Sequence, residues 1–176
     1  MSPDIPGPQA AVPPPREGGV VLCLGNALHG DDGVAEAVGQ ALIAAGLPPG
    51  WSVQAMGTRG LDALAWLVDA PAVVLVDAAE PVGQPGRVAE RDPATVPLEP
   101  AVVGHGLGLG HLLRAWRASV PVQAPLRLLT IEMAALRPFH PGLSPPVAQA
   151  VAPAAAVVSG WLADIRWQLP AGVGIC

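Results

Sequence analysis

Residues 19–33 read GVVLCLGNALHGDDG, an apolar hexapeptide followed by a turn rich in glycine and aspartate. The unbroken apolar run 19–24 is typical of a strand that is buried on both faces of a sheet. The residues that follow, 33–45, place apolar side chains at helical spacing. A buried strand, a glycine-rich turn and a helix in succession indicate the start of an α/β domain.

The same alternation continues along the chain. We expect further strands and helices at the following residues: strands at 51–56, 72–76 and 126–131, a short polar edge strand within 81–91, and helices at 61–68, 107–118 and 145–165. Strands that alternate with helices predict one α/β domain with a mostly parallel, twisted central sheet of about five strands and helices on both faces. We expect this domain at residues 19–168, after a disordered proline-rich segment at 1–18 and before a tail at 169–176.

The composition excludes several classes of protein. The 176 residues are 51% apolar and 13% charged, which excludes a wholly disordered acidic or basic chain. Nine arginines, no lysine and 14 acidic residues give a net charge of −5, so we expect no nucleic acid and no membrane among its partners. Polar residues, a proline and a glycine interrupt the apolar stretch 145–162, which makes it a poor membrane span. The first fifteen residues lack the basic and apolar regions of a signal peptide, so we expect a cytoplasmic protein.

Polar side chains are expected to meet along one edge of the sheet. Ligands gather beyond the carboxyl ends of parallel strands, so residues in the connections from strands to helices are the informative ones. They are the turn 25–33, Asp77 after the strand 72–76, and His105 before the helix 107–118. Two carboxylates and one imidazole form an open ligand set that suits a divalent transition metal, and imidazole favours nickel, zinc or copper over magnesium. The pattern therefore indicates a metal site.

Each of these residues also has a purely structural explanation. One of Asp31 and Asp32 is expected to cap the helix that follows, which leaves the other to point at the edge of the sheet. Asp77 on its own is compatible with a simple strand end, and His105 with a helix cap or a solvent-facing side chain. A nucleotide site is disfavoured, because two adjacent aspartates would repel a phosphate. The turn also matches neither of the phosphate-binding patterns G-x-G-x-x-G and G-x-x-x-x-G-K-[ST].

Several motifs, in order from Val20 to Ala163, resemble those of the hydrogenase maturation proteases. They are GNALHGDDG at 25–33, GTRGLDAL at 57–64, VDA at 76–78 with PGRV at 85–88, HGLGL at 105–109 and GLSP at 142–145. The resemblance implies a single α/β domain and an endopeptidase without a serine or cysteine nucleophile. Such an enzyme removes a short C-terminal extension from the large-subunit precursor of a nickel–iron hydrogenase once nickel has been inserted.

The resemblance also implies roles for individual residues. By motif, Asp32 and Asp77 are the implied catalytic residues, and Asp32, Asp77 and His105 are the implied metal-contacting residues. The nickel is expected to be carried by the substrate and to serve recognition, and no nucleotide is expected. Hydrolysis has two routes, in which either a carboxylate acts as general base or a metal activates the water. A non-catalytic accessory module that checks nickel insertion in the large subunit needs the same three ligands and is the alternative function.

Overall fold

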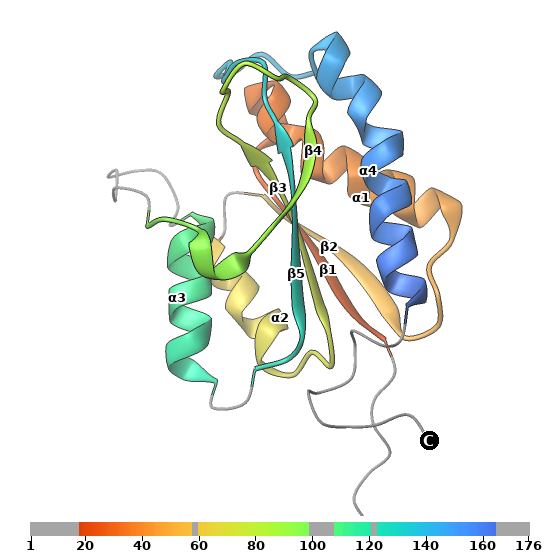
Figure 1. The fold of residues 1–176 in the computed structure, drawn as a ribbon, viewed down its shortest axis with the longest axis vertical. Helices are drawn as coiled ribbons and strands as arrows, with labels where there is room; N and C mark the ends of the chain where they lie inside the picture. The colour runs from red at the N-terminus through yellow and green to blue at the C-terminus, as the bar shows by residue number, and fades with distance from the viewer. Residues whose placement is uncertain (1–17, 58–59, 99–107, 121–122, 165–176) are drawn as a thin grey trace, which may run out of the picture.

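A central sheet of five strands organises the computed structural model, which describes residues 18–57, 60–98, 108–120 and 123–164 (Figure 1). The strands are β1 (Gly19–Leu24), β2 (Trp51–Gly57), β3 (Val73–Ala79), β4 (Val88–Arg91) and β5 (Leu126–Glu132). The α-helices are α1 (Val34–Ala45), α2 (Leu64–Val68), α3 (Leu109–Ser119) and α4 (Pro145–Ala163). The expected α/β alternation is confirmed, with a 3-10 turn (Gly60–Ala63) in place of the first part of the predicted helix 61–68.

The strands lie in the order β2-β1-β3-β5-β4. The pairs β1–β2, β1–β3 and β3–β5 are parallel, and β4 alone runs antiparallel, beside β5. The short polar strand β4 therefore lies at an edge, as its composition predicts. An ion pair between Arg127 and Glu90, with 2.8 Å between nitrogen and oxygen, joins the side chains of β5 and β4.

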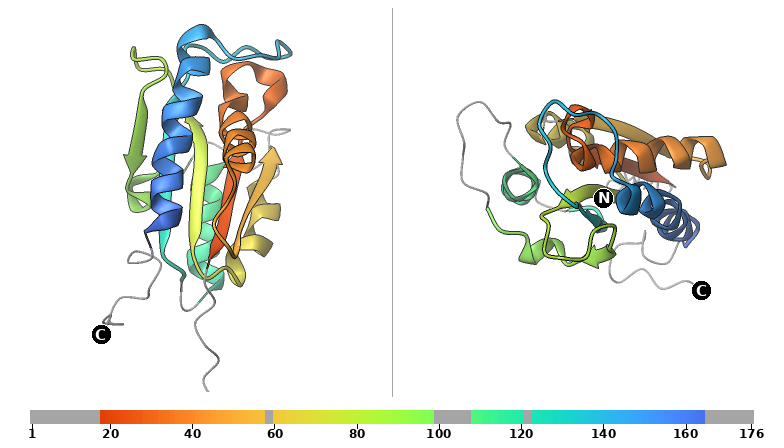
Figure 2. Two further views of the ribbon diagram at one scale, coloured as in Figure 1. Left: turned by 90° about the vertical axis from the view of Figure 1, so that its right-hand side faces the viewer. Right: turned by 90° about the horizontal axis from the view of Figure 1, so that it is seen from above.

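Helices cover both faces of the sheet (Figure 2), with α1 and α4 on one face and α2 and α3 on the other. In β1, Val21 and Cys23 pack on the side of α1 and α4, while Val20 and Leu22 pack on the side of α2 and α3. This alternation follows from the pleat of a strand, which sends successive side chains to opposite faces. It explains why β1 is apolar throughout and confirms a sheet with helices on both faces.

Helix α4 is the longest helix and the most apolar late segment. An 18-residue window of it has a mean hydropathy of 1.4, long and apolar enough by composition to cross a membrane. Seven of its residues are nevertheless buried inside the domain: Val147, Ala150, Ala154, Ala155, Val158, Trp161 and Leu162. Helix α4 packs against α1 and β5, and 39% of this window is buried inside the domain.

Strand β3 extends past the predicted end at residue 76. Asp77 lies within the strand, opposite Thr130 of β5, and the ladder continues to Ala79 and Glu132. The prediction that the strand ends just before Asp77 was therefore wrong. The reason is that β5 is long enough to supply hydrogen-bond partners for the backbone of residues 77–79, which a local apolar pattern does not reveal.

The side on which the chain adds strands to the sheet changes between β1 and β3. After β1 the chain moves to β2 on one side, and it later returns to β3 on the other side. In open α/β sheets such a switch point opens a crevice at the carboxyl ends of the strands, where ligands bind. The terminal segments 1–17 and 165–176 lie outside the described residues, so the predicted domain boundaries stay a prediction.

Candidate active site

The turn between β1 and α1 holds its shape through backbone contacts. Gly25 has a φ of +111°, and a Cβ there would collide with the carbonyl oxygen of Asp32. The side chain of Asn26 accepts a hydrogen bond from the N–H of Leu28 at 3.0 Å. Two consecutive 3-10 turns, Ala27–His29 and Asp31–Gly33, then lead into α1. The glycines and Asn26 thus fold this segment tightly over the end of β1.

Asp32 points back across this turn. Its Oδ2 accepts a hydrogen bond from the backbone N–H of Asn26 at 2.8 Å, and its side chain is half-buried. Burial raises the pKa of Asp32 above its ordinary value of 3.8, although the Asn26 N–H and the charge of nearby His29 act in the opposite direction. A desolvated carboxylate held by one oxygen is a group that can accept a proton or contact a cation with the other.

Asp31 has a different role from its neighbour. It is 3% exposed, and it accepts hydrogen bonds from the Ala134 N–H at 2.9 Å, the Ser144 N–H at 2.6 Å and the Ser144 hydroxyl at 2.9 Å. Burial disfavours its charge, but these donors outweigh burial and lower the pKa of Asp31 below 3.8. Asp31 therefore fastens the turn to the loop between β5 and α4.

Neither aspartate caps a helix. No side-chain hydrogen bond caps α1, whose N-cap is Gly33, or the 3-10 turn before it. The expected capping role was therefore wrong, because Asp31 binds a loop distant in sequence and Asp32 binds Asn26. The other half of that expectation, one aspartate turned toward the edge of the sheet, fits the position of Asp32.

Asp77 lies at the same edge. Cys23 of β1 pairs with Val76, so Asp77 follows at the level where β1 ends. The 3-10 turn that contains Asp32 contacts β3, which brings the elements carrying the two aspartates together across the switch point. Asp77 is half-buried, and its Oδ1 accepts a hydrogen bond from the N–H of Ala78 at 2.9 Å. Val73 and Leu75 face α2 and α3, so the pleat directs Asp77 to that face as well.

Glu132 is a buried carboxylate that the sequence analysis did not identify. It ends β5 at 1% exposure, and its Oε1 accepts hydrogen bonds from the N–H groups of Val82 at 2.8 Å and Gln84 at 2.6 Å. Its Oε2 lies 3.3 Å from a guanidinium nitrogen of Arg87. Burial opposes its charge, but these donors and the arginine prevail and lower its pKa below 4.5. Glu132 thus shapes the β3–β4 loop beside the site. Its signal in the sequence was a lone carboxylate directly after an apolar strand.

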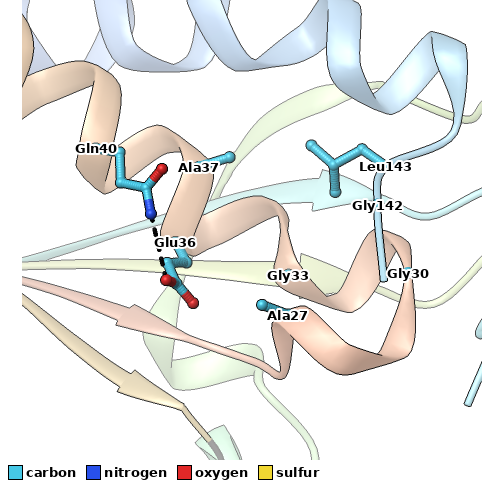
Figure 3. A pocket seen from close by; sticks show the side chains of 8 residues that line it. All are labelled: Ala27, Gly30, Gly33, Glu36, Ala37, Gln40, Gly142 and Leu143. Carbon is cyan, nitrogen blue, oxygen red and sulfur yellow. Dashed lines mark hydrogen bonds between the residues drawn. The ribbon is translucent and has the colours of Figure 1, made fainter. Parts of the chain in front are cut away.

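A small hollow lies beside the turn, on the side of α1 (Figure 3). It has a volume of about 160 Å³ and does not include Asp32 or Asp77. Its walls come from the turn, the first half of α1 and the loop before α4: Ala27, Gly30, Gly33, Glu36, Ala37, Gln40, Gly142 and Leu143. The polar side chains there are Glu36 and Gln40, joined by a hydrogen bond of 3.3 Å. The hollow therefore lies where the β1–α1 turn and α1 meet the loop before α4, and it is separate from the pair of aspartates.

The third residue of the predicted metal set, His105, lies outside the described residues. Within the described ranges, no group of three or more His, Cys, Asp and Glu residues is arranged to hold a metal ion. The shared site of Asp32, Asp77 and His105 therefore stays a prediction. Helix α3 begins at Leu109, four positions after His105 in the sequence. This helix lies on the face of the sheet toward which Asp77 points.

Comparisons with known proteins identify a protease family. The family model HycI, described as hydrogenase maturation protease, matches residues 37–161. A comparison with curated proteins finds no match. Among solved structures, the chain is similar to the hydrogenase maturating endopeptidase HybD from E. coli, with 27% identity, a TM-score of 0.67 and coverage of 83% of this chain and 91% of that one.

Two archaeal structures are also similar. The hydrogenase 2 maturation peptidase from Thaumarchaeota archaeon SCGC_AB-539-E09 has 26% identity and a TM-score of 0.60, with coverage of 84% of this chain and 98% of that one. The nickel–iron hydrogenase maturation protease HycI from Thermococcus kodakarensis has 21% identity and a TM-score of 0.64, with coverage of 85% and 94%. The last likeness shows the fold alone.

Proposed function

Since the chain belongs to the hydrogenase maturation protease family, we propose that it removes a C-terminal extension from the nickel-loaded large-subunit precursor of a nickel–iron hydrogenase. The observation that supports this most strongly is the placement of Asp32 and Asp77 on the two sides of the switch point. Two carboxylates from different strand ends, in the crevice where such folds bind ligands, suit hydrolysis of a bond presented at that edge.

Asp32 is the proposed general base. Its raised pKa makes it a better proton acceptor than an exposed carboxylate. The Asn26 N–H orients Oδ2, and within the described part of the chain Oδ1 has no hydrogen-bond donor. A water molecule at Oδ1 would lose its proton to Asp32 as its oxygen attacks the scissile carbonyl carbon. The same proton then passes to the leaving nitrogen when the carbon–nitrogen bond breaks.

Asp77 and His105 are the proposed partners of Asp32 around the nickel of the substrate. Carboxylate and imidazole groups are suitable ligands for that ion. An open set with only one nitrogen ligand differs from a resident hydrolytic zinc site, which commonly has three protein ligands and more nitrogen or sulfur. We therefore assign the nickel to the substrate, as the feature by which the enzyme recognises a loaded precursor. The alternative, in which a metal activates the water, uses the same residues.

The proposal also covers the setting of the reaction. A hydrogenase large subunit that has just received its nickel is the proposed partner, and the cytoplasm is the proposed compartment. Neither a nucleotide nor a nucleic acid takes part in the proposed reaction. A non-catalytic module that checks nickel insertion would bind the same precursor without cutting it.

The test is to incubate metal-stripped protein with a large-subunit precursor, either nickel-loaded or nickel-free, and to follow the mass of the large subunit. Loss of the C-terminal peptide from the loaded precursor alone is the expected result. Equal cutting of both precursors would overturn nickel recognition. Binding of the loaded precursor without cutting would identify the non-catalytic module instead, and loss of cutting on metal stripping, restored by added metal, would favour a metal held by the protease.

A further inference from the structure

Three large apolar side chains are exposed beside the candidate active site. Leu28 is 57% exposed on the β1–α1 turn, and Leu136 and Phe139 are 53% and 80% exposed on the loop between β5 and α4. The two loops lie side by side at the carboxyl end of the sheet in Figures 1 and 2. We call these three residues the apolar platform. Exposed apolar side chains that gather at one place mark a surface for a partner more often than scattered ones do.

The two loops are joined by direct contacts. Gly30 and Leu136 form an antiparallel β-bridge, and the Arg137 N–H donates to the carbonyl oxygen of His29 at 3.4 Å. The rings of His29 and Phe139 meet edge to face, with 5.4 Å between their centroids. The buried Asp31 fastens the same two loops from below through Ser144 and Ala134. The platform is therefore held in place before any partner arrives, which reduces the entropy cost of binding.

Phe139 has a backbone conformation that is unfavourable for a residue with a side chain. Its φ is +58°, the one positive φ at a non-glycine residue in the described part of the chain. An aromatic residue in this left-handed region is strained, and a side chain that is 80% exposed recovers little energy by burial. The strain at Phe139 therefore has little compensation from burial within this chain.

Arg137 is the exposed charged side chain of the two loops, in a chain with a net charge of −5. Arg137 and His140 are exposed on the same loop, and His29 lies against Phe139. The acidic residues of the two loops are Asp31, which is buried by its hydrogen bonds, and Asp32, which is half-buried. A complementary partner therefore combines apolar side chains with a carboxylate that can pair with Arg137.

We propose that the apolar platform is the docking surface for the segment of the large-subunit precursor that flanks the scissile bond, an apolar stretch with a carboxylate placed to pair with Arg137. The inference rests on the proposed function. Leu28 and His29 lie within four residues of Asp32 on the same turn, so a bond presented to Asp32 lies close to this part of the platform. Loss of two such side chains from the contact should weaken the affinity about tenfold.

The experiment compares a double variant, Leu136→Ser with Phe139→Asn, with the full-length wild-type chain. Asparagine tolerates the left-handed backbone at position 139, so the variant should fold. The matched control is Ile43→Ser, because Ile43 is 58% exposed near the far end of α1. Cleavage of the nickel-loaded precursor is followed by mass at several concentrations. We expect the double variant to raise KM about tenfold with kcat within about twofold, and the control to match wild type.

The outcomes separate the docking surface from the activity itself. If wild type cuts the precursor and the double variant has the same KM, the docking surface is wrong and the proposed function stands. If wild type cuts no loaded precursor, the proposed function fails and the inference fails with it. A fall in kcat alone would assign these residues to the chemical step. A wild-type dimer that the double variant converts to a monomer, by light scattering, would identify the platform as a contact between copies of the chain.

Discussion

Asp31 accepts hydrogen bonds from both the backbone N–H and the hydroxyl group of Ser144, although the two residues are 113 positions apart in the chain. Its neighbour Asp32 turns the other way and binds the N–H of Asn26. Two identical side chains, adjacent in sequence, therefore have opposite surroundings. Asp31 is buried among donors that stabilise its charge, while Asp32 is half-buried where burial disfavours its charge. We expect the first to matter for stability and the second for chemistry.

Replacement of Asp31 should destabilise the fold. In Asp31→Asn the amide NH2 group faces backbone donors, so the free energy of unfolding should fall by about 1.5–3 kcal/mol, the range for hydrogen bonds to a charged group. Ser144→Ala, which removes only one donor, should cost about 1 kcal/mol. Urea denaturation of both variants measures these differences. An unfolding free energy of Asp31→Asn equal to that of wild type would show that the contact between the loops carries no stability.

The same carboxylate predicts a dependence of stability on pH. Because the folded pKa of Asp31 is below the unfolded value of 3.8, the folded state binds fewer protons between the two values. The stabilisation is therefore complete above 3.8 and is lost as the pH falls through the folded pKa. The difference in unfolding free energy between wild type and Asp31→Asn should be constant from neutral pH down to about pH 5 and shrink below about pH 4. A difference that grows on acidification would contradict this sign.

Asp32 should show the opposite sign. Its folded pKa lies above 3.8, so its stabilising contribution is present below the unfolded pKa and is lost as the pH rises through the folded pKa. Above the folded pKa the ionised group is therefore a cost to the folded state. We expect Asp32→Asn to unfold at the same or a higher urea concentration than wild type, and to lose processing of the loaded precursor. A strongly destabilised Asp32→Asn would assign this residue a structural role.

Glu132 should stabilise the loop between β3 and β4 locally. Glu132→Gln removes the charge that pairs with Arg87 and weakens the hydrogen bonds from Val82 and Gln84, at a cost of about 1–3 kcal/mol. Hydrogen exchange of the Val82 and Gln84 amides should speed up in this variant. The control is Glu90→Gln, because Glu90 forms an exposed pair with Arg127, whose loss should cost less than about 1 kcal/mol. Equal effects of the two variants would contradict the structural role of Glu132.

Much of this fold follows from local patterns in the sequence. The runs Gly19–Leu24 and Val73–Val76 are apolar because helices cover both faces of the sheet, so a local pattern identifies them as buried strands. The position of Asp77 toward the carboxyl edge follows from the apolar run 72–76 that precedes it. These features depend on residues close together in the chain, which is why the sequence predicts them.

The remaining features depend on contacts between distant segments. The division of roles between Asp31 and Asp32 requires the loop that carries Ser144, and no local rule states which aspartate this loop will bind. The continuation of β3 past Asp77 depends on the length of β5. The burial of Glu132 depends on the β3–β4 loop folding back over the strand end. Each of these is a tertiary contact that overrides the local preference.

The most direct test of the central claim is the rate at which Asp77→Asn releases the C-terminal peptide from a nickel-loaded precursor. The substitution keeps the size of the side chain and removes its charge, so the circular dichroism spectrum should match that of wild type. Asp69→Asn, the same change at an exposed residue after α2, is the control. We predict a rate at least about 100-fold below wild type for Asp77→Asn and an unchanged rate for the control. A rate for Asp77→Asn within about twofold of wild type would contradict the account.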